Sequence, residues 1–248
     1  MSMARMKNPW ENISLDDYEN HMSLDSVMQL QAMNSIMKDQ FAAYDVHTAM
    51  VLGVAGGNGL EHAHDAKYEK IYAVDINEAY LKAAAGRHAS MGNSLECLHL
   101  DIVKDAQMLP KAELVIANLL IEYIGYSAFQ NVIRQVDALY VSCVIQQNAN
   151  DEDWVSDSPY LHVFDGLEAI HHQMEENSLT AAMNEIGYAK ILSSSVSLPN
   201  GKELIRIDYQ KEKMLNFDLI NRDLNEKVVG HTIGHVAFTP DSEGADFF

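Results

Sequence analysis

The residues with the clearest chemical pattern are four glycines that fall within seven positions, inside residues 51–61 (VLGVAGGNGLE). Because glycine has no Cβ, such a loop can turn tightly and bring its backbone close to a ligand. The loop follows a short apolar run and precedes a predicted helix, whose first N–H groups favour an anionic partner. Glycine clusters also make plain turns, so this pattern alone predicts either a nucleotide-binding loop or a tight turn.

Three polar residues extend the pattern. Asp75, Asp101 and Asn118 each close an apolar run, as the Gly-rich loop closes the run before them. Parallel strands end at the same edge of a sheet, and open α/β sheets bind ligands at that edge. A carboxylate at Asp75 can accept hydrogen bonds from both hydroxyls of a ribose. Each aspartate could instead cap a turn or a helix, but four such coincidences in a row favour a nucleotide site.

Strand-like and helix-like segments alternate from Thr48 onward, which predicts a parallel sheet with helices on both faces. Five strands are expected, at residues 49–52, 71–74, 95–100, 114–117 and 139–145, and the first of them is a short, continuous apolar run. Two further runs, 188–198 and 203–209, meet at Asn200-Gly201, a dipeptide typical of β-hairpins. The expected fold class is α/β: a Rossmann-like, doubly wound sheet of about seven strands, five parallel, with a C-terminal antiparallel hairpin.

Apolar residues at helical spacing predict the helices. Ser23 is expected to cap a helix over residues 27–37, and Asn77 is expected to cap the helix after the second strand. The other expected helices cover residues 129–136, 167–174 and 179–186.

Residues 45–210 resemble the class I S-adenosylmethionine-dependent methyltransferases. The resemblance is carried by the Gly-rich loop, the two aspartates at strand ends and the closing hairpin. The Gly-rich segment and the N-terminal stretch 18–22 (YENHM) are similar to an uncharacterised bacterial subgroup of these enzymes. The resemblance implies S-adenosyl-L-methionine as cofactor and methyl transfer to an unidentified small molecule. It also implies a helical cap over the cofactor at residues 1–44 and the methyltransferase domain at 45–210. Residues 211–248 are expected to form a partly disordered C-terminal extension.

The resemblance implies a role for each position of the site. Asp75 would hold the ribose hydroxyls with Ile76 against the adenine, and Asp101 and Ile102 would meet the edge and face of that base. Asn118 would lie under the methionine moiety. The loop residues expected to bind the cofactor, most of them along its methionine part, are Gly53, Ala55, Gly56, Gly57 and Gly59.

Two loop positions depart from the family pattern. Gly53 stands where the family has an acidic residue, and Ala55 stands where it has its first glycine, so backbone carbonyls or Glu61 must receive the cofactor ammonium. The Asn-Pro-Pro-Tyr type motif of amide and exocyclic-amine methylation is absent. Residues 118–123 (NLLIEY) occupy its place, which weighs against N6-adenine or glutamine-amide methylation.

Glu122 and Tyr123, just past the fourth strand, are the candidate catalytic residues. Methyl transfer from a sulfonium is an in-line displacement, so positioning supplies much of the catalysis. A general base is needed only where the nucleophile loses a proton. A helix-start carboxylate beside a packed aromatic ring would explain the same pair.

The candidate substrate contacts come from two segments. Tyr18 and His21 belong to the N-terminal stretch that resembles the methyltransferase subgroup, and Trp154 and Tyr160 belong to the irregular stretch 146–166. Long loops in compact domains are often functional. We therefore expect this stretch to be either a lid whose aromatic rings bound the acceptor or a surface excursion.

The composition limits the classes of molecule that the protein is expected to bind. The 248 residues include 36 acidic and 17 basic side chains, for a formal net charge of −19. This argues against nucleic acid, because phosphate backbones are bound by clustered Lys and Arg. No stretch reaches the roughly 20 apolar residues that span a bilayer, and the N-terminus lacks the apolar core of a signal peptide. We expect a cytoplasmic protein that acts on a small molecule.

No metal site is expected. Cys97 and Cys143 lie in strand-like runs and are predicted to be buried free thiols. The histidine pairs 62/64 and 171/172 share no helix face, and flanking glycines disfavour a helix through the pair 231/235.

Two other functions stay open. An NAD-dependent oxidoreductase would use the same loop and Asp75 to bind its cofactor. The G-x-x-G-G-x-G spacing and the closing hairpin favour a methyltransferase instead. A non-catalytic module that binds S-adenosylmethionine or S-adenosylhomocysteine would need the same sequence features. Homodimerisation through residues 211–230 is also left open.

Overall fold

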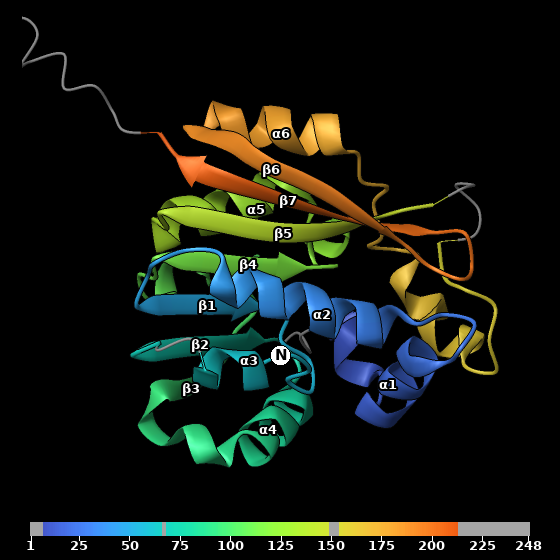
Figure 1. The fold of residues 1–248 in the computed structure, drawn as a ribbon. Helices are drawn as coiled ribbons and strands as arrows, with labels where there is room; N and C mark the ends of the chain where they lie inside the picture. Colours follow the sequence, from blue (N-terminus) through green and yellow to red (C-terminus); the bar gives the residue numbers. More distant parts are fainter. Residues whose placement is uncertain (1–6, 66–67, 149–153, 213–248) are drawn as a thin grey trace, which may run out of the picture. The chain divides into compact units, whose positions relative to one another are not determined.

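Seven strands form one sheet in the order β3-β2-β1-β4-β5-β7-β6 (Figure 1). The computed structural model describes residues 7–65, 68–148 and 154–212. The first five strands are parallel, β7 is antiparallel to β5, and β6 pairs antiparallel with β7. The strands are β1 Thr48–Leu52, β2 Lys70–Asp75, β3 Leu95–His99, β4 Leu114–Asn118, β5 Tyr140–Gln147, β6 Tyr188–Ser197 and β7 Glu203–Lys211.

The predicted fold class is confirmed by this strand order and by the C-terminal hairpin. The hairpin turn includes the predicted Asn200-Gly201, where Gly201 has a φ of +81° that favours glycine. β7 continues to Lys211. Most of the predicted C-terminal extension, including nearly all of the segment considered for dimerisation and the histidine pair 231/235, lies outside the described residues.

Helices cover both faces of the sheet (Figure 1). Those described are α1 Leu15–Ser23, α2 Gln29–Ala42, α3 Glu61–Asp65, α4 Glu78–Arg87, α5 Ile121–Val136 and α6 Glu176–Glu185. Side chains alternate between the two faces along each strand. In β1, Ala49 and Val51 pack with residues of α2, α3 and α4, whereas Met50 and Leu52 pack with α5. The central strands are continuously apolar because both of their faces are buried.

One predicted helix cap is confirmed and the other is wrong. The side chain of Asn77 accepts the N–H groups of Ala79 and Tyr80 at 3.0 and 3.3 Å, so it caps α4. Ser23 is the last residue of α1, whose cap is Ser14. The prediction was based on the apolar spacing of α2. That spacing does not reveal α1, the polar helix that precedes it and ends at Ser23.

The predicted helix over 167–174 is also wrong. A 3-10 turn ends at Leu167, and α6 begins only at Glu176. Leu167 and Met174 are both buried, but they belong to two different apolar clusters. Their helical spacing therefore does not reflect a common helix face. The helix over 179–186 is present as α6.

A buried polar network ties α2 to the sheet beside the carboxyl end of β4. The amides of Gln40 and Asn118 bond to each other twice, at 2.9 and 2.8 Å. Gln40 also donates to the hydroxyl of Ser142 at 2.9 Å, and that hydroxyl donates to Asp208, which pairs with Arg206. Because the group is buried, each member depends on the others for its hydrogen bonds.

We predict that Gln40→Met lowers the free energy of unfolding by about 2–4 kcal/mol, because it leaves the half-buried amide of Asn118 and the buried hydroxyl of Ser142 with fewer partners. Urea unfolding measures the change. Lys38→Met, on the exposed face of α2, is the control and should stay within about 0.5 kcal/mol of wild type. Equal effects of the two substitutions would contradict the prediction.

Candidate functional site

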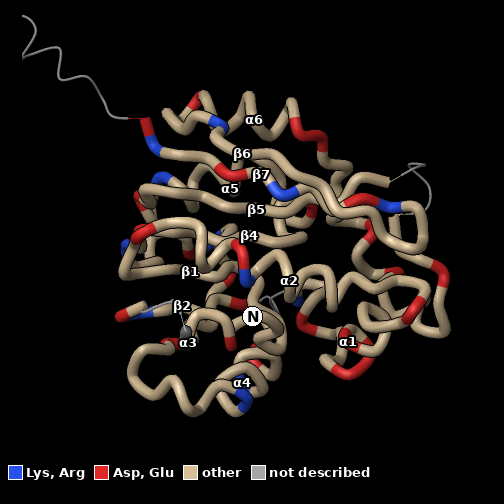
Figure 2. The backbone as a smooth tube through the Cα atoms, viewed as in Figure 1, with Lys and Arg blue, Asp and Glu red and all other residues tan. Residues whose placement is uncertain are grey.

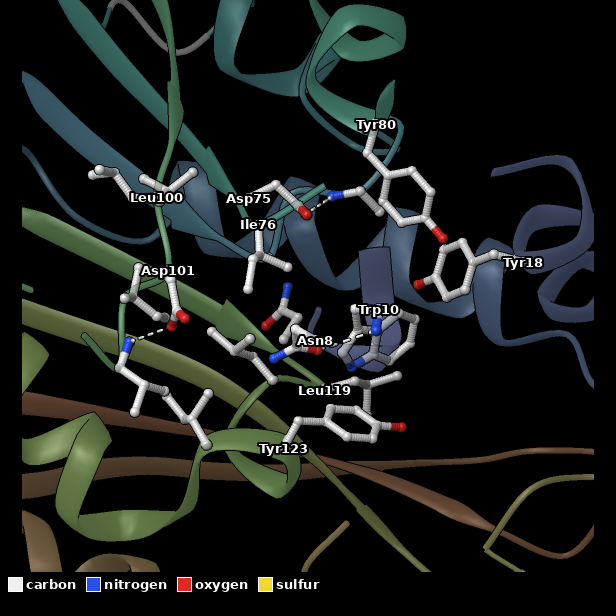
Figure 3. A pocket seen from close by; sticks show the side chains of 18 residues that line it. Asn8, Trp10, Tyr18, Asp75, Ile76, Tyr80, Leu100, Asp101, Leu119 and Tyr123 are labelled. Carbon is white, nitrogen blue, oxygen red and sulfur yellow. Dashed lines mark hydrogen bonds between the residues drawn. The ribbon is translucent and has the colours of Figure 1, made fainter. Parts of the chain in front are cut away.

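A pocket opens at the carboxyl edge of the sheet, where β1, β2 and β4 end (Figure 3). We call it the Asp75 pocket. Further walls come from the segment after β3, the first turn of α5 and the N-terminal residues Asn8 and Trp10. The predicted site residues that line it are Gly53, Ala55, Asp75, Ile76, Asp101, Ile102, Asn118, Tyr18 and Tyr123.

Asp75 fixes the loop that follows β1. One carboxylate oxygen accepts the N–H of Ala55 at 2.9 Å, and the other accepts the N–H of Asn77 at 2.8 Å. Burial raises the pKa of this carboxyl, and the two amide hydrogen bonds oppose the shift. Gly53 and Ala55 have φ values of +66° and +48°, so the loop turns through a left-handed backbone. Each carboxylate oxygen has a further lone pair that a ligand can use.

One wall of the Asp75 pocket carries the apolar side chains of Ile76 and Ile102. Asp101 lies beside them, but its side chain accepts the N–H of Val103 at 3.2 Å and pairs with Lys104 (Figure 3). Asp101 therefore stabilises the turn that follows β3 while one side of it faces the pocket.

Tyr80 brings an unpaired hydroxyl to the same pocket. Its Oη is buried and has no hydrogen-bond partner among the described residues. Its ring lies beside that of Tyr18, with centroids 6.2 Å apart (Figure 3). An unpaired buried hydroxyl costs about 1–3 kcal/mol, so a ligand that bonds to Tyr80 would gain from satisfying it.

Two loop glycines lie against helices instead of the Asp75 pocket. A Cβ on Gly59 would lie 2.7 Å from the sulfur of Met37 in α2. A Cβ on Gly57 would lie 3.0 Å from the ring of His88, just after α4. These glycines allow the close approach of the two helices to the loop.

Gly56 lies where α1 and α4 meet the loop. The guanidinium of Arg87 donates to Glu19 at 2.8 Å and to the carbonyl of Gly56 at 3.1 Å. Glu19 and Gly56 line a narrow cleft that shares its loop wall with the Asp75 pocket. Glu61, by contrast, accepts the N–H of Gly59 at 3.0 Å and lines neither space. The helix that begins with Glu61 has five residues.

The chain after β4 adopts a strained conformation. Leu119 has a φ of +52°, a left-handed conformation that costs a residue with a side chain about 1–2 kcal/mol. Gly125, at φ +73°, separates the first turn of α5 from the rest of that helix. This short turn carries Glu122 and Tyr123 away from the main helix axis. Backbone strain of this kind often accompanies a functional site.

A second pocket, which we call the aromatic pocket, adjoins the first. The two share Trp10, Tyr18, Leu119 and Tyr123. The rings of Trp10 and Tyr123 meet edge to face, with centroids 4.9 Å apart. Further walls are formed by Met22, His21, Gln29, Glu122, Gln146, Trp154, Val155, Ser156, Phe164 and His171.

The candidate catalytic and substrate residues meet here, although they come from distant segments. Those that line the aromatic pocket are Tyr18, His21, Glu122, Tyr123 and Trp154. Tyr160 does not line it and packs in the apolar cluster behind it. Sequence reasoning missed Trp10, Phe164 and His171. Trp10 stood in an aromatic N-terminal segment, which was a usable signal, but no pattern pairs His171 with Trp154, whose rings stack at 4.2 Å.

Glu122 is a buried carboxylate of the aromatic pocket. It is 5% exposed, and its Oε2 has no hydrogen-bond partner among the described residues. Burial raises its pKa to about 8, and its own backbone N–H opposes the shift. A simple helix-start carboxylate would be solvated, so the aromatic surroundings distinguish Glu122 from that interpretation.

Solved structures resemble this fold, although the sequence matches no known family and no curated protein. Magnesium protoporphyrin IX methyltransferase (ChlM) from Synechocystis PCC 6803, with bound SAH, is 13% identical, with a TM-score of 0.59 over 79% of this chain and 94% of that one. N-methyltransferase NodS from Bradyrhizobium japonicum WM9, in complex with S-adenosyl-L-homocysteine, is 10% identical, with a TM-score of 0.59 over 80% and 98%.

A third similar structure is 1,6-didemethyltoxoflavin-N1-methyltransferase from Burkholderia thailandensis, with bound 1,6-didemethyltoxoflavin and S-adenosylhomocysteine. It is 13% identical, with a TM-score of 0.54 over 85% of this chain and 93% of that one. At these identities the likeness shows the fold. The chain has the Rossmann-like fold of class I S-adenosylmethionine-dependent methyltransferases, and the resemblance seen in the sequence is confirmed at that level.

Lys and Arg are scattered over the described elements and gather on no single one of them (Figure 2). Within the described ranges, no helix is long and apolar enough to cross a membrane. In the same ranges, no group of three or more His, Cys, Asp or Glu side chains could hold a metal ion.

We predict that Glu122→Gln makes the protein less sensitive to rising pH. The Glu122 pKa rises from 4.5 to about 8 on folding, so as pH increases the unfolded chain releases this proton first. The wild-type free energy of unfolding then falls across this window, by at most about 1.4 kcal/mol per pH unit. The glutamine variant lacks this loss, and thermal unfolding across the window detects the difference.

Glu185→Gln, on the exposed face of α6, is the control and should follow the wild-type curve. The raised pKa of Asp75 also makes the free energy of unfolding fall with rising pH, and it does so equally in all three proteins. The informative quantity is therefore the difference between the pH curves of the variants and of wild type. Parallel pH curves for wild type and Glu122→Gln would show that Glu122 titrates normally.

Proposed function

We propose that this chain is a methyltransferase that binds S-adenosyl-L-methionine in the Asp75 pocket. The supporting observation is the combination of a buried carboxylate, an unpaired hydroxyl and an apolar wall at the carboxyl edge of the sheet. Asp75 and Tyr80 suit the two hydroxyls of a ribose. Ile76 and Ile102 suit the faces of a flat base, with Asp101 at its edge. These residues therefore fit an adenosine.

We further propose that the methionine end of the cofactor extends toward Gly53, Ala55 and Asn118, into the cleft beside Glu19. The family's acidic loop residue is missing at Gly53, and Glu19 of α1 supplies a carboxylate in the adjoining cleft. Glu19 is thus a better candidate for the cofactor ammonium than Glu61. Gly56, Gly57 and Gly59 hold the loop shape by allowing the helices to pack against it.

The acceptor is assigned to the aromatic pocket, because that pocket shares a wall with the Asp75 pocket. When bound, the cofactor would supply an electrophilic methyl group, carried on a sulfonium, to a lone pair of the acceptor. The protein's part is to hold the acceptor in line and to exclude water. Leu119 and Tyr123, which border both pockets, are placed to set that line, with His21 and Trp154 across the acceptor.

The N-terminal region, residues 1–44, is proposed to act as the cap of this site. Trp10 and Tyr18 line both pockets. The side chain of Asn77, in the sheet domain, donates to the carbonyl of Trp10 at 3.0 Å. Together with the Arg87–Glu19 pair, this bond holds the region against the sheet domain at residues 45–210.

The partners proposed are a small-molecule acceptor and no nucleic acid, in keeping with the net charge of −19 and the scattered basic residues. A cytoplasmic location fits the same picture. The NAD-dependent alternative is less favoured, because β7 enters antiparallel at the position where a dinucleotide fold continues its parallel half. A non-catalytic module that binds the cofactor would share every feature of the Asp75 pocket, so turnover must distinguish it.

We predict that Asp75→Asn weakens binding of S-adenosylmethionine and S-adenosylhomocysteine at least about tenfold, because the ribose hydroxyls lose a charged acceptor. Isothermal titration calorimetry measures both ligands and NAD. Asp25→Asn, in the exposed turn after α1, is the control and should bind as wild type does. Thermal unfolding shows whether Asp75→Asn keeps its fold. Saturable NAD binding without the sulfur nucleosides would favour an oxidoreductase and contradict the proposal.

We predict that Glu19→Gln weakens binding of S-adenosylhomocysteine about tenfold but changes binding of 5′-methylthioadenosine less than about twofold. The second ligand has the nucleoside and the sulfur but no amino-acid end. A group that meets the ammonium therefore affects only the first ligand. Equal losses for both ligands would mean that Glu19 acts by holding the cap, through Arg87, and not by binding the cofactor.

A further inference from the structure

The aromatic pocket joins several aromatic rings to a single buried carboxylate. Trp154 stacks on His171 with an interplanar angle of 18°. Tyr123 meets both of these rings edge to face, at 6.5 and 5.9 Å. Aromatic faces carry partial negative charge and attract cations, most strongly when water is excluded. Glu122, whose buried Oε2 has no described partner, lines the same space.

The other titratable groups around this pocket leave Glu122 without a counter-charge. Burial lowers the pKa of His21 and of His171, and Lys202 lowers both further, so these rings are neutral at neutral pH. The ammonium of Lys202 donates to the carbonyl of Trp154 at 2.6 Å. Lys202 lowers the pKa values of the two histidines. The pKa of Glu122 is instead set by burial and by the backbone N–H of Glu122 itself.

The tyrosine hydroxyls of this pocket do not supply a positive charge to Glu122 either. Tyr18 and Tyr123 both have raised pKa values, with Glu122 among the causes after burial, so they stay neutral. The same holds for the buried thiol of Cys143, on β5. The Oε2 of an ionised Glu122 is therefore an acceptor without a described donor, in a pocket whose walls favour positive charge.

We propose that the methyl acceptor is a small organic amine, bound as its ammonium with the N–H on Glu122 Oε2 and the cation against the aromatic rings. This inference rests on the proposed function, since it names the acceptor class of the same site. A carboxylic acid or a phenolate would add a second buried anion beside Glu122. A neutral alcohol would leave the aromatic faces without a cation.

The same contact prepares the amine for reaction. A protonated nitrogen has no lone pair, so it cannot attack a methyl group. Transfer of its proton to Glu122 Oε2 leaves a neutral amine with a free lone pair and a neutral carboxyl group. The lone pair then forms the new carbon–nitrogen bond, and the positive charge that leaves sulfur ends on the methylated nitrogen. Glu122 returns its proton to solvent when the product leaves.

The chain offers a direct probe of this pocket. Its two tryptophans, Trp10 and Trp154, both line it, so their fluorescence reports occupancy. The test compares benzylamine with benzyl alcohol, which has nearly the same size but no charge, in the presence of S-adenosylhomocysteine. Titrations are run near pH 8, where Glu122 is partly ionised.

Wild type should bind benzylamine at least about tenfold more tightly than benzyl alcohol. Glu122→Gln should remove that preference, Glu122→Asp should keep part of it, and the exposed control Glu185→Gln should keep all of it. Circular dichroism and thermal unfolding check that each variant folds. Loss of benzylamine binding in Trp154→Phe, with the signal from Trp10, would support the aromatic contribution.

Three outcomes would overturn the inference: equal binding of amine and alcohol, a preference that survives in Glu122→Gln, or no saturable benzylamine signal up to about 10 mM. Calorimetry with S-adenosylhomocysteine separates these from a failure of the proposed function. If the nucleoside binds and the amine preference is absent, only the acceptor class is wrong. If the nucleoside does not bind, the methyltransferase assignment fails, whatever the amine does.

Discussion

The carboxylate of Asp75 is the constraint on which the site depends. Its two oxygens hold the amides of Ala55 and Asn77, so one side chain sets both the loop after β1 and the start of α4. The left-handed turn at Gly53 and the close packing of α2 on Gly59 follow from that loop path. A ligand at this edge therefore meets a carboxylate that is already oriented, and little reorganisation is needed on binding.

Two sets of polar side chains contrast with each other in the described part of the chain. Gln40, Asn118 and Ser142 satisfy one another and join α2 to the sheet. Tyr80 Oη and Glu122 Oε2 have no described partner, and the two residues each line one of the adjoining pockets. The mutually bonded set thus lies beside the site, while the residues with an unpaired atom belong to the pocket walls. Such a division is expected where structure is traded for binding.

Much of the fold was predictable because its signals are local. Apolar runs marked the central strands, and Asn77 and the Asn-Gly turn marked boundaries through their own hydrogen bonding and backbone preferences. The cofactor edge followed, since parallel strands all end there. The aromatic pocket was only partly predictable, because it joins residues such as Trp10, Glu122 and His171 from distant segments. Whether a helix-start glutamate is solvated or enclosed depends on those partners and cannot be read from its neighbours.

The wall shared by the two pockets has a thermodynamic consequence. Trp10 and Tyr18 belong to one N-terminal segment and face both spaces. A ligand that orders this segment from one side lowers the entropy lost when a second ligand binds on the other side. Under the proposed function the two binding events would therefore be linked, and the linkage would be reciprocal: each ligand would raise the affinity for the other by the same factor. Cooperativity between cofactor and acceptor would then require no large domain movement. It would require only that both ligands order the same N-terminal segment.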